Sequence, residues 1–452
     1  MFDLATFVEA VRRERPRDVV DVQREVNPKH ETAAIILKLE QRHRSPLLVF
    51  HRVSGTPFPL VTNVCGSVAR LALALGCPVA ELSRCYAERI AQPIKPELTA
   101  DAPVQERIST GERVDLQALP QLIYHEHDAA QPYITAAIVV ARDPETGKTN
   151  LSFHRLMMTG RNSTAIFMAH GKHLESIYRK YESANEAMPI AAFIGAHPTC
   201  TLGALYSGTP DTEEYDIIGG LQRAPLRVTK CVTDDLQVPA NSEFVLEGVV
   251  PPRQRVLEGP FGEFTGYAKG RIWTPVFHVK AITSRSEPLF QDIVGGSFEH
   301  LLLPILALEH DLLHAARAVV PNTVKVKAVA PLTVVAAIEK TDDSQPEQLM
   351  RALLSHDIYV KQVIVVDSDV DIGDLRQVTG AIALHVRPDR DVRIYPQQRG
   401  TELDPSAESE DGATAKLGLD ATMSKSARDI RKNTVPQRVL DSIDVTQLLD
   451  SH

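Results

Sequence analysis

Short apolar runs, each closed by a turn signal, dominate the middle of the chain. The run at 133–141 ends at an Asp-Pro-Glu-Thr-Gly turn, and a second run begins at Asn150, which predicts a β-hairpin. The other elements predicted here are three strands, at 226–232, 243–249 and 276–283, and an inserted helix at 163–183. Several short strands separated by turns predict a barrel or a sandwich.

The last third of the chain alternates between strand and helix patterns. Apolar runs predict strands at 332–338, 360–366 and 392–395, and helical patterns fill the intervals at 345–355 and 372–384. This βαβαβ order predicts a parallel sheet with helices on its faces. A final helix is predicted around 436–449, and we expect it to dock on a neighbouring subunit.

The first part of the chain mixes both patterns until three prolines interrupt them, at Pro93, Pro96 and Pro103. A length of 452 residues suggests about three domains. We therefore predict an α/β (α+β) multidomain chain. Its parts are an N-terminal α+β domain at 1–110, a central β-barrel domain at 111–305 and a C-terminal α/β domain at 306–452.

Composition narrows the class of function. The net charge of −9 gives no reason to expect a nucleic acid partner. The five cysteines are scattered and form no CxxC pair, so they indicate neither a disulfide framework nor a zinc site. The amino terminus reads as a capped amphipathic helix, and no apolar run is long enough to span a membrane. We therefore predict a cytoplasmic protein without a membrane partner.

Two glutamates, Glu258 and Glu263, flank a Gly-Pro-Phe-Gly segment. On a helix they would lie about 140° apart, and on a strand they would point to opposite faces. The glycines can adopt dihedral angles closed to other residues, and Pro260 fixes its own φ, so the segment is predicted to be a shaped loop. Such a loop is suited to aiming two carboxyl groups at one point for acid/base chemistry. Taken alone, a turn with two solvated glutamates is the better explanation of the pattern.

The sequence Glu-Gly-Pro-Phe-Gly-Glu at 258–263, followed by Thr-Gly-Tyr at 265–267, resembles the signature of the UbiD family of decarboxylases, which use a prenylated flavin mononucleotide (prenylated FMN). Other segments resemble family blocks in the same order: 149–155, 170–173, 210–219, 239–248 and 415–422. The resemblance implies that the central domain is a flavin-reductase-like split β-barrel that binds this flavin, and that the C-terminal domain mediates oligomerisation.

The resemblance also implies a cofactor site. Asn150, His173 and Glu214 match the positions of the family's metal ligands, with His170 and Glu213 as the alternatives for the last two. Oxygen and nitrogen donors suit Mn²⁺ or Mg²⁺, which would hold the cofactor phosphate, and K⁺ is a further expected ion. Lys416 matches the family lysine that reaches the flavin phosphate.

Catalysis is assigned through the same resemblance to Arg155, Glu258 and Glu263. Arg155 would keep Glu258 ionised and could bind the substrate carboxylate, because a guanidinium favours a neighbouring carboxylate. Glu263 would lie in a drier place and hand a proton to carbon after CO₂ leaves. Regular alternation points Asn150 and Arg155 to opposite faces, so a bend between them is required if both serve one site.

Two further segments concern the substrate side. His300 resembles a residue at the lip of the substrate pocket and is predicted to contact substrate. Relatives carry Pro-Arg-Glu-Ala shortly afterwards, whereas this chain has Ala-Leu-Glu-His at 307–310, so substrate identity does not transfer. The run His-Glu-His-Asp at 125–128 is interpreted as a solvated polar loop and not as a metal site.

Together these features predict a reversible, non-oxidative decarboxylase of an aromatic, heteroaromatic or α,β-unsaturated carboxylic acid. In the family, substrate forms a covalent adduct with the prenylated FMN, CO₂ departs and the acid protonates the remaining carbon. The expected partners are the carboxylic acid, CO₂, a flavin prenyltransferase that supplies the cofactor, and further copies of the chain as a homodimer or larger oligomer. The alternatives are a flavin-binding or assembly protein without turnover, and a flavin-independent metal hydrolase.

Overall fold

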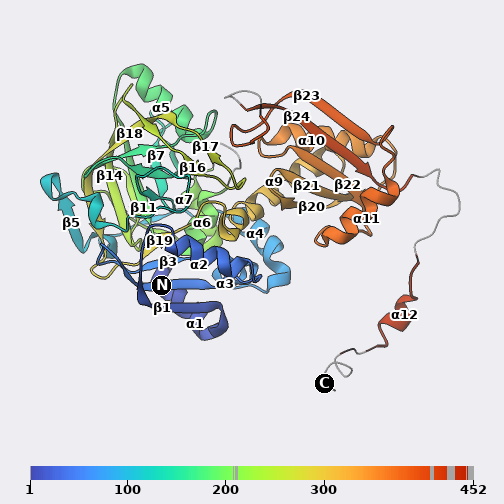
Figure 1. The fold of residues 1–452 in the computed structure, drawn as a ribbon, viewed down its shortest axis with the longest axis horizontal. Helices are drawn as coiled ribbons and strands as arrows, with labels where there is room; N and C mark the ends of the chain where they lie inside the picture. Colours follow the sequence, from blue (N-terminus) through green and yellow to red (C-terminus); the bar gives the residue numbers. More distant parts are fainter. Residues whose placement is uncertain are drawn as a thin grey trace.

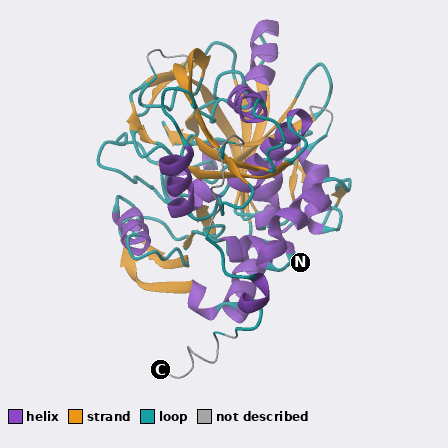
Figure 2. Cartoon of the chain, turned by 90° about the vertical axis from the view of Figure 1, so that its right-hand side faces the viewer, coloured by secondary structure: helices purple, strands orange, loops and turns teal. Residues whose placement is uncertain are grey.

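The computed structural model describes residues 2–206, 208, 212–407, 412–424, 433–443 and 445. Figure 1 shows a large β-rich lobe, built from the N-terminal and central segments, beside an α/β lobe built from the C-terminal segment. In Figure 2 helices lie around the strands of the β-rich lobe. Among the described residues, no helix combines the length and apolar character needed to cross a membrane.

The N-terminal segment forms a four-stranded sheet with four helices. In sheet order the strands are β1 (Val19–Val26), β2 (Leu47–Val53), β3 (Leu60–Thr62) and β19 (Phe290–Asp292). The helices are α1 (Leu4–Glu14), α2 (Glu31–Glu40), α3 (Val68–Leu75) and α4 (Leu82–Ile90). Because β19 comes from the central segment and pairs parallel with β3, the chain just before His300 is anchored on the N-terminal sheet.

The central segment builds a ten-stranded sheet around its longest strand, β18 (Ile272–Ser284). The other strands are β5 (Arg107–Thr110), β6 (Tyr133–Ile134), β7 (Ile138–Arg142), β8 (Thr149–Phe153), β9 (Leu156–Met158), β10 (Ser163–Ile166), β11 (Met188–Ile194), β14 (Phe244–Val250) and β15 (Arg255–Glu258). The predicted hairpin is present, because β7 and β8 pair antiparallel. The run at 133–141 is split into two strands where the Thr135 hydroxyl turns to Asp292, 2.8 Å away.

Smaller elements complete this lobe. They are β4 (Glu97–Leu98), β12 (Arg227–Lys230), β13 (Gln237–Pro239), β16 (Phe261–Gly262), β17 (Ala268–Lys269), α5 (His173–Ala184), α6 (Pro198–Ala204), α7 (Glu214–Gln222) and α8 (Phe298–Leu302). The helix predicted at 163–183 was wrong in its first part. Residues 163–166 form β10 between β9 and β18, because their apolar side chains are buried in the sheet, and the helix begins only after Gly171, whose φ is +74°.

The C-terminal lobe is a five-stranded sheet of mixed direction. Its order is β20 (Thr323–Ala330), β21 (Thr333–Ile338), β22 (Gln362–Asp367), β24 (Ala413–Ala421) and β23 (Val392–Arg399). Its helices are α9 (Ile305–Val319), α10 (Gln345–His356) and α11 (Leu375–His385). The parallel prediction holds for β21 and β22 but was wrong for β23, which is an antiparallel edge strand. The unpredicted β24 takes the parallel place beside β22.

The last predicted helix is only partly described. Within the range predicted at 436–449, α12 (Gln437–Leu440) is a short helix, and residues 444 and 446–449 lie outside the described part of the chain.

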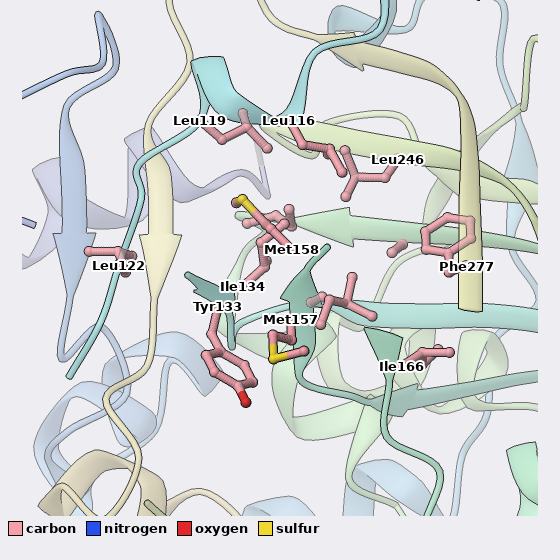
Figure 3. Close-up of a cluster of buried hydrophobic side chains, with 14 of the residues drawn as sticks. Leu116, Leu119, Leu122, Tyr133, Ile134, Met157, Met158, Ile166, Leu246 and Phe277 are labelled. Carbon is pink, nitrogen blue, oxygen red and sulfur yellow. The ribbon is translucent and has the colours of Figure 1, made fainter. Parts of the chain in front are cut away.

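The main hydrophobic core fills the interior of the β-rich lobe. Figure 3 shows part of it, including Tyr133, Met157 and Phe277. Tyr133 is fully buried at the margin of this cluster, and its hydroxyl points away from the labelled apolar side chains. The Tyr133 hydroxyl is thus a polar group at the edge of the apolar core.

Candidate active site

Arg155, Glu258 and Glu263 meet in one buried cluster. Nε and Nη2 of Arg155 donate to Oε1 and Oε2 of Glu258, both at 2.9 Å, and Nη1 donates to Glu263. The three side chains are 10%, 1% and 7% exposed, respectively. The bend required by the sequence is present, because residues 154 and 155 lie between β8 and β9 and belong to neither strand.

The loop that carries the two acids is held by hydrogen bonds from a distant segment. β15 ends at Glu258, and Gly259 then adopts a φ of +97° that favours glycine. The Gly262 amide donates to Asp128 at 2.7 Å, and the Ala129 amide donates to the carbonyl of Pro260 at 2.7 Å. These bonds fix the direction in which the loop presents both carboxyl groups.

The interpretation of 125–128 as a solvated loop was wrong for Asp128. Its side chain is fully buried, and besides the Gly262 amide it accepts the backbone amide of His125 at 2.8 Å. Burial opposes ionisation of Asp128, but the hydrogen bonds from His125 and Gly262 outweigh it and hold the pKa below its ordinary value. A Cβ on Gly262 would lie 2.4 Å from Nδ1 of His125, so this position requires glycine.

Aromatic side chains complete the surroundings of the guanidinium. The Arg155 guanidinium carbon lies 4.0 Å from the ring centre of Phe167 and 4.9 Å from that of Phe261, within the range of a cation–π interaction. The hydroxyl of Tyr133 donates to Oε1 of Glu258 at 3.0 Å. The roles of these aromatic residues were not predicted, because their sequence signal is that of ordinary core positions.

A chain of hydrogen bonds leads from Asn150 to the backbone of Phe167, whose ring contacts the Arg155 guanidinium. The Asn150 amide donates to Ser152 at 3.1 Å, Ser152 contacts Nε2 of His154 at 2.8 Å, and Nδ1 of His154 donates to the Phe167 carbonyl at 2.7 Å. Burial lowers the pKa of His154 to about 4, so the imidazole is neutral and bears its proton on Nδ1. The side-chain oxygen of Asn150 is then the atom suited to a cation.

Glu214 lies in the first turn of α7 and contacts the residue that follows Asn150. Its side chain accepts the backbone amide of Leu151 at 3.2 Å, while the neighbouring Glu213 accepts that of Thr149 at 2.6 Å. Burial raises the pKa of Glu214 to about 7, and the charge of Glu213 adds to the effect. A divalent ion beside this buried carboxyl group would favour its ionised form.

The two candidate histidines are not gathered with these oxygens. His173 is exposed at the start of α5, and His170 contacts Arg179 at 3.3 Å on the surface. Within the described residues, no three side chains of the His, Cys, Asp and Glu types form a group that could hold a metal ion. The structure therefore places Glu214 against the backbone of the residue after Asn150 and leaves His173 exposed on another element.

Lys416 lies in β24 with its side chain almost fully buried. Its ammonium group donates to the carbonyls of Leu354 and Asp357, at 2.6 and 3.2 Å, at the end of α10. Burial lowers its pKa. A phosphate would have to compete with these two carbonyls for the lysine.

His300 lies next to the acidic loop. Its Nδ1 accepts the Gly296 amide at 3.2 Å, and its ring meets the edge of Phe264, the residue after Glu263, with 6.2 Å between centres. Burial, aided by the charge of Arg155, lowers the pKa of His300 to about 4. The Phe264 ring also packs edge-to-face on the ring of Tyr359 in the C-terminal lobe, with 5.7 Å between ring centres. The cluster thus lies where the two lobes meet.

The comparisons with known proteins agree with this geometry. Models of the N-terminal, central (Rift-related) and C-terminal domains of 3-octaprenyl-4-hydroxybenzoate carboxy-lyase match residues 12–90, 97–298 and 305–421. The chain belongs to the UbiD family of carboxy-lyases, as the sequence predicted.

Relatives with assigned reactions span most of the chain. The chain is 33% identical to anhydromevalonate phosphate decarboxylase of Methanosarcina mazei, covering 89% of this chain and 92% of the relative. It is also 33% identical to phenolic acid decarboxylase of a Streptomyces species, covering 95% and 94%. The relatives thus include decarboxylases of two chemically different acids.

Solved structures share the fold. The UbiD-class enzyme HmfF from Pelotomaculum thermopropionicum, in complex with FMN, superimposes with a TM-score of 0.89 at 34% identity, covering 98% of this chain and 99% of that one. The closed form of vanillic acid decarboxylase from Sedimentibacter hydroxybenzoicus superimposes with a TM-score of 0.85 at 30% identity, covering 99% and 97%. The mixed α/β multidomain fold is therefore confirmed.

Proposed function

We propose that this carboxy-lyase decarboxylates, reversibly and without net oxidation, an aromatic, heteroaromatic or α,β-unsaturated carboxylic acid. The observation that carries the proposal is the buried meeting of one arginine with two glutamates from separate parts of the chain. Two acids that share one cation but differ in their hydrogen bonds can take different roles, one as a permanent carboxylate and the other as a proton donor.

The hydrogen bonds divide the roles between the two glutamates. Glu258 accepts two bonds from Arg155 and one from Tyr133, so three donors hold its two carboxyl oxygens. Glu263 accepts from Arg155 through a single nitrogen. Glu263 is therefore the carboxyl group that is able to leave the cation and take up a proton.

Arg155 retains donors for the substrate. A guanidinium carries five N–H groups, and the two glutamates engage three of those on Arg155. A substrate carboxylate that binds the other two competes with Glu263 for the same cation. As the carbon–carbon bond to CO₂ breaks, the electron pair stays on the substrate, and Glu263 delivers its proton to that carbon.

Decarboxylation at an unsaturated carbon needs an electron sink, which a bound prenylated FMN supplies. The solved structures of HmfF are complexes with FMN and, in an evolved dimeric form, with prenylated FMN. In this chain Asn150 and Glu214 would hold the phosphate through Mn²⁺ or Mg²⁺, His173 would join them, and Lys416 would approach from the C-terminal lobe. K⁺ remains a further proposed ion.

A homo-oligomer is part of the proposal. Figure 1 shows α12 away from both lobes, and Val439, Leu440 and Ile443 are 43%, 51% and 56% exposed in and after it. An apolar segment of this kind is suited to docking on a second copy of the chain.

The proposal is tested by producing the protein with and without a flavin prenyltransferase. Mass spectrometry identifies the bound cofactor, and a panel of unsaturated and aromatic acids is screened for CO₂ release. We expect release only from the protein made with the prenyltransferase. Release without any flavin would instead identify a flavin-independent decarboxylase. A metal-dependent hydrolase would release no CO₂ and would cleave esters or amides without any flavin, and prenylated FMN binding without release from any acid would indicate an assembly protein.

A further inference from the structure

The buried hydroxyl of Tyr133 is an unusual feature of the core. Its ring packs against Phe261 with 4.6 Å between centres, and the residue is fully buried. A phenylalanine would fill the same space without bringing a polar group into an apolar cluster. Packing alone does not explain the hydroxyl, because a buried polar group without a hydrogen-bond partner lowers the stability of the folded protein.

That partner is the catalytic carboxylate. The Tyr133 hydroxyl donates to Oε1 of Glu258 at 3.0 Å, the same oxygen that accepts Nε of Arg155 at 2.9 Å. Burial, together with the charge of Glu258, raises the pKa of Tyr133, so the hydroxyl keeps its proton and acts only as a donor. Oε1 of Glu258 thus receives two donors, Tyr133 from β6 and Arg155 from the bend before β9.

Backbone pairing fixes this arrangement. Tyr133 lies in β6, which pairs with β9 so that Ile134 faces Leu156, the residue after Arg155. The Tyr133 amide also donates to the Leu122 carbonyl at 2.9 Å. Tyr133 therefore approaches Glu258 from β6, and Arg155 approaches it from the bend directly before β9, the strand that pairs with β6.

We infer that Tyr133 is a positioning residue that holds Glu258 as the permanent partner of Arg155 and thereby leaves the transferable proton to Glu263. This inference rests on the proposed function. It adds a structural reason why Glu258 stays with Arg155 while Glu263 carries the proton. Without the hydroxyl, the two glutamates differ less in their hold on Arg155, and Glu258 competes with Glu263 for the proton.

The test compares Y133F with Y124F. Tyr124 is a matched control: it is buried, lies in the same segment and touches the edge of Phe261, but its hydroxyl donates to Asp292 at 2.6 Å and not to Glu258. The first readout is the ¹H–¹⁵N resonance of the Arg155 Nε–H in protein without cofactor. We expect Y133F to move it downfield, because Oε1 then serves one donor in place of two, and Y124F to leave it in place.

The second readout is kinetic and uses holoenzyme. We expect Y133F to lower kcat about tenfold with KM within about twofold of wild type, the effect of losing one hydrogen bond to a charged group. In an E258Q background the same substitution should have almost no effect, since Tyr133 acts through Glu258. An undisturbed Nε–H resonance in Y133F, an unchanged kcat, or an equal loss in the E258Q background would each overturn the inference.

The two readouts separate this inference from the proposed function. If the Nε–H resonance moves in Y133F and not in Y124F, but wild-type protein loaded with prenylated FMN releases no CO₂ from any acid, the proposed function fails. The placement of Tyr133 on Glu258 then stands, and its role as a positioning residue for proton transfer is overturned with the reaction.

Discussion

The acid/base cluster and the predicted cofactor site differ in how far the polypeptide alone assembles them. Arg155, Glu258 and Glu263 are joined by direct hydrogen bonds and enclosed by aromatic rings. In the predicted metal set, Glu214 contacts the backbone of the residue after Asn150, while His173 is exposed on another element. The cluster has its own cation in Arg155, whereas no cation among the described residues pairs with the buried Glu214. The first site is thus joined by the chain's own hydrogen bonds, and we expect the second to be completed by a ligand.

Removing the Arg155 guanidinium should disrupt the cluster that it forms with Glu258 and Glu263. R155L leaves two buried carboxylates without their cation, which typically costs about 3–5 kcal/mol, and we expect CO₂ release to fall roughly 10³-fold. Thermal unfolding and CO₂ release from the same preparation check this.

A suitable control is R161L, because Arg161 is 60% exposed and pairs with Asp115 at 3.3 Å on the surface. Equal behaviour of R155L and R161L would mean that the arginine does not hold the cluster together.

The ligand-dependent site is tested through the titration of Glu214. Its pKa rises from 4.5 in the unfolded chain to about 7 in the folded protein, so the folded state binds this proton more tightly. The stability linked to this group is present below pH 4.5 and is lost as the pH rises through 7, by up to about 3 kcal/mol.

We expect E214Q to be less sensitive than wild type to a shift from pH 5 to pH 8 when no metal is added. Mn²⁺ should raise the melting temperature of wild type at pH 8 and leave that of E214Q unchanged. Equal responses of the two proteins to Mn²⁺ would place the ion elsewhere.

The support of the acidic loop gives a smaller effect. D128A removes the acceptors for the Gly262 and His125 amides, so the loop loses its fixed direction, and we expect kcat to fall about tenfold. E126A is the control, since Glu126 lies exposed in the same segment and should retain wild-type kcat. Steady-state kinetics of both variants decide whether the hydrogen bonds of Asp128, and not the segment in general, position Glu263.

The smallest effect is expected at His300. With a pKa of about 4, it is neutral throughout the range from pH 6 to pH 8. We expect H300Q to raise KM about fivefold without altering the shape of the pH–rate profile in that range. A pH profile that changes shape in H300Q would assign the titration to this histidine and not to a glutamate.

Sequence reasoning named Arg155, Glu258 and Glu263 through their resemblance to the family signature, and the structure places the three side chains in one cluster. The required bend before Arg155 is present at residues 154 and 155, but Phe261 and Gly262 of the acidic loop form the short strand β16. The supporting residues escaped prediction for a physical reason. Asp128 reads as a loop residue and Tyr133 as a strand residue, and only the tertiary pairing of distant segments brings them to Gly262 and Glu258.

The fold shows the same limit. Local patterns located the hairpin at β7 and β8 and the alternating strands of the C-terminal lobe. They assigned 163–166 to a helix because the following residues are helical, but pairing with β18 decides for a strand. Strand order is equally non-local, so the insertion of β24 between β22 and β23 left no signal in the order of the elements.

The central claim is that Glu263 carries the proton that replaces CO₂. The most direct measurement compares wild type and E263Q, both loaded with prenylated FMN to an occupancy determined on the same samples, in a single-turnover assay of CO₂ and product formation. The account predicts that both proteins hold the same amount of cofactor and that E263Q forms product at least about 10²-fold more slowly than wild type. Product formation in E263Q at the wild-type rate would contradict it.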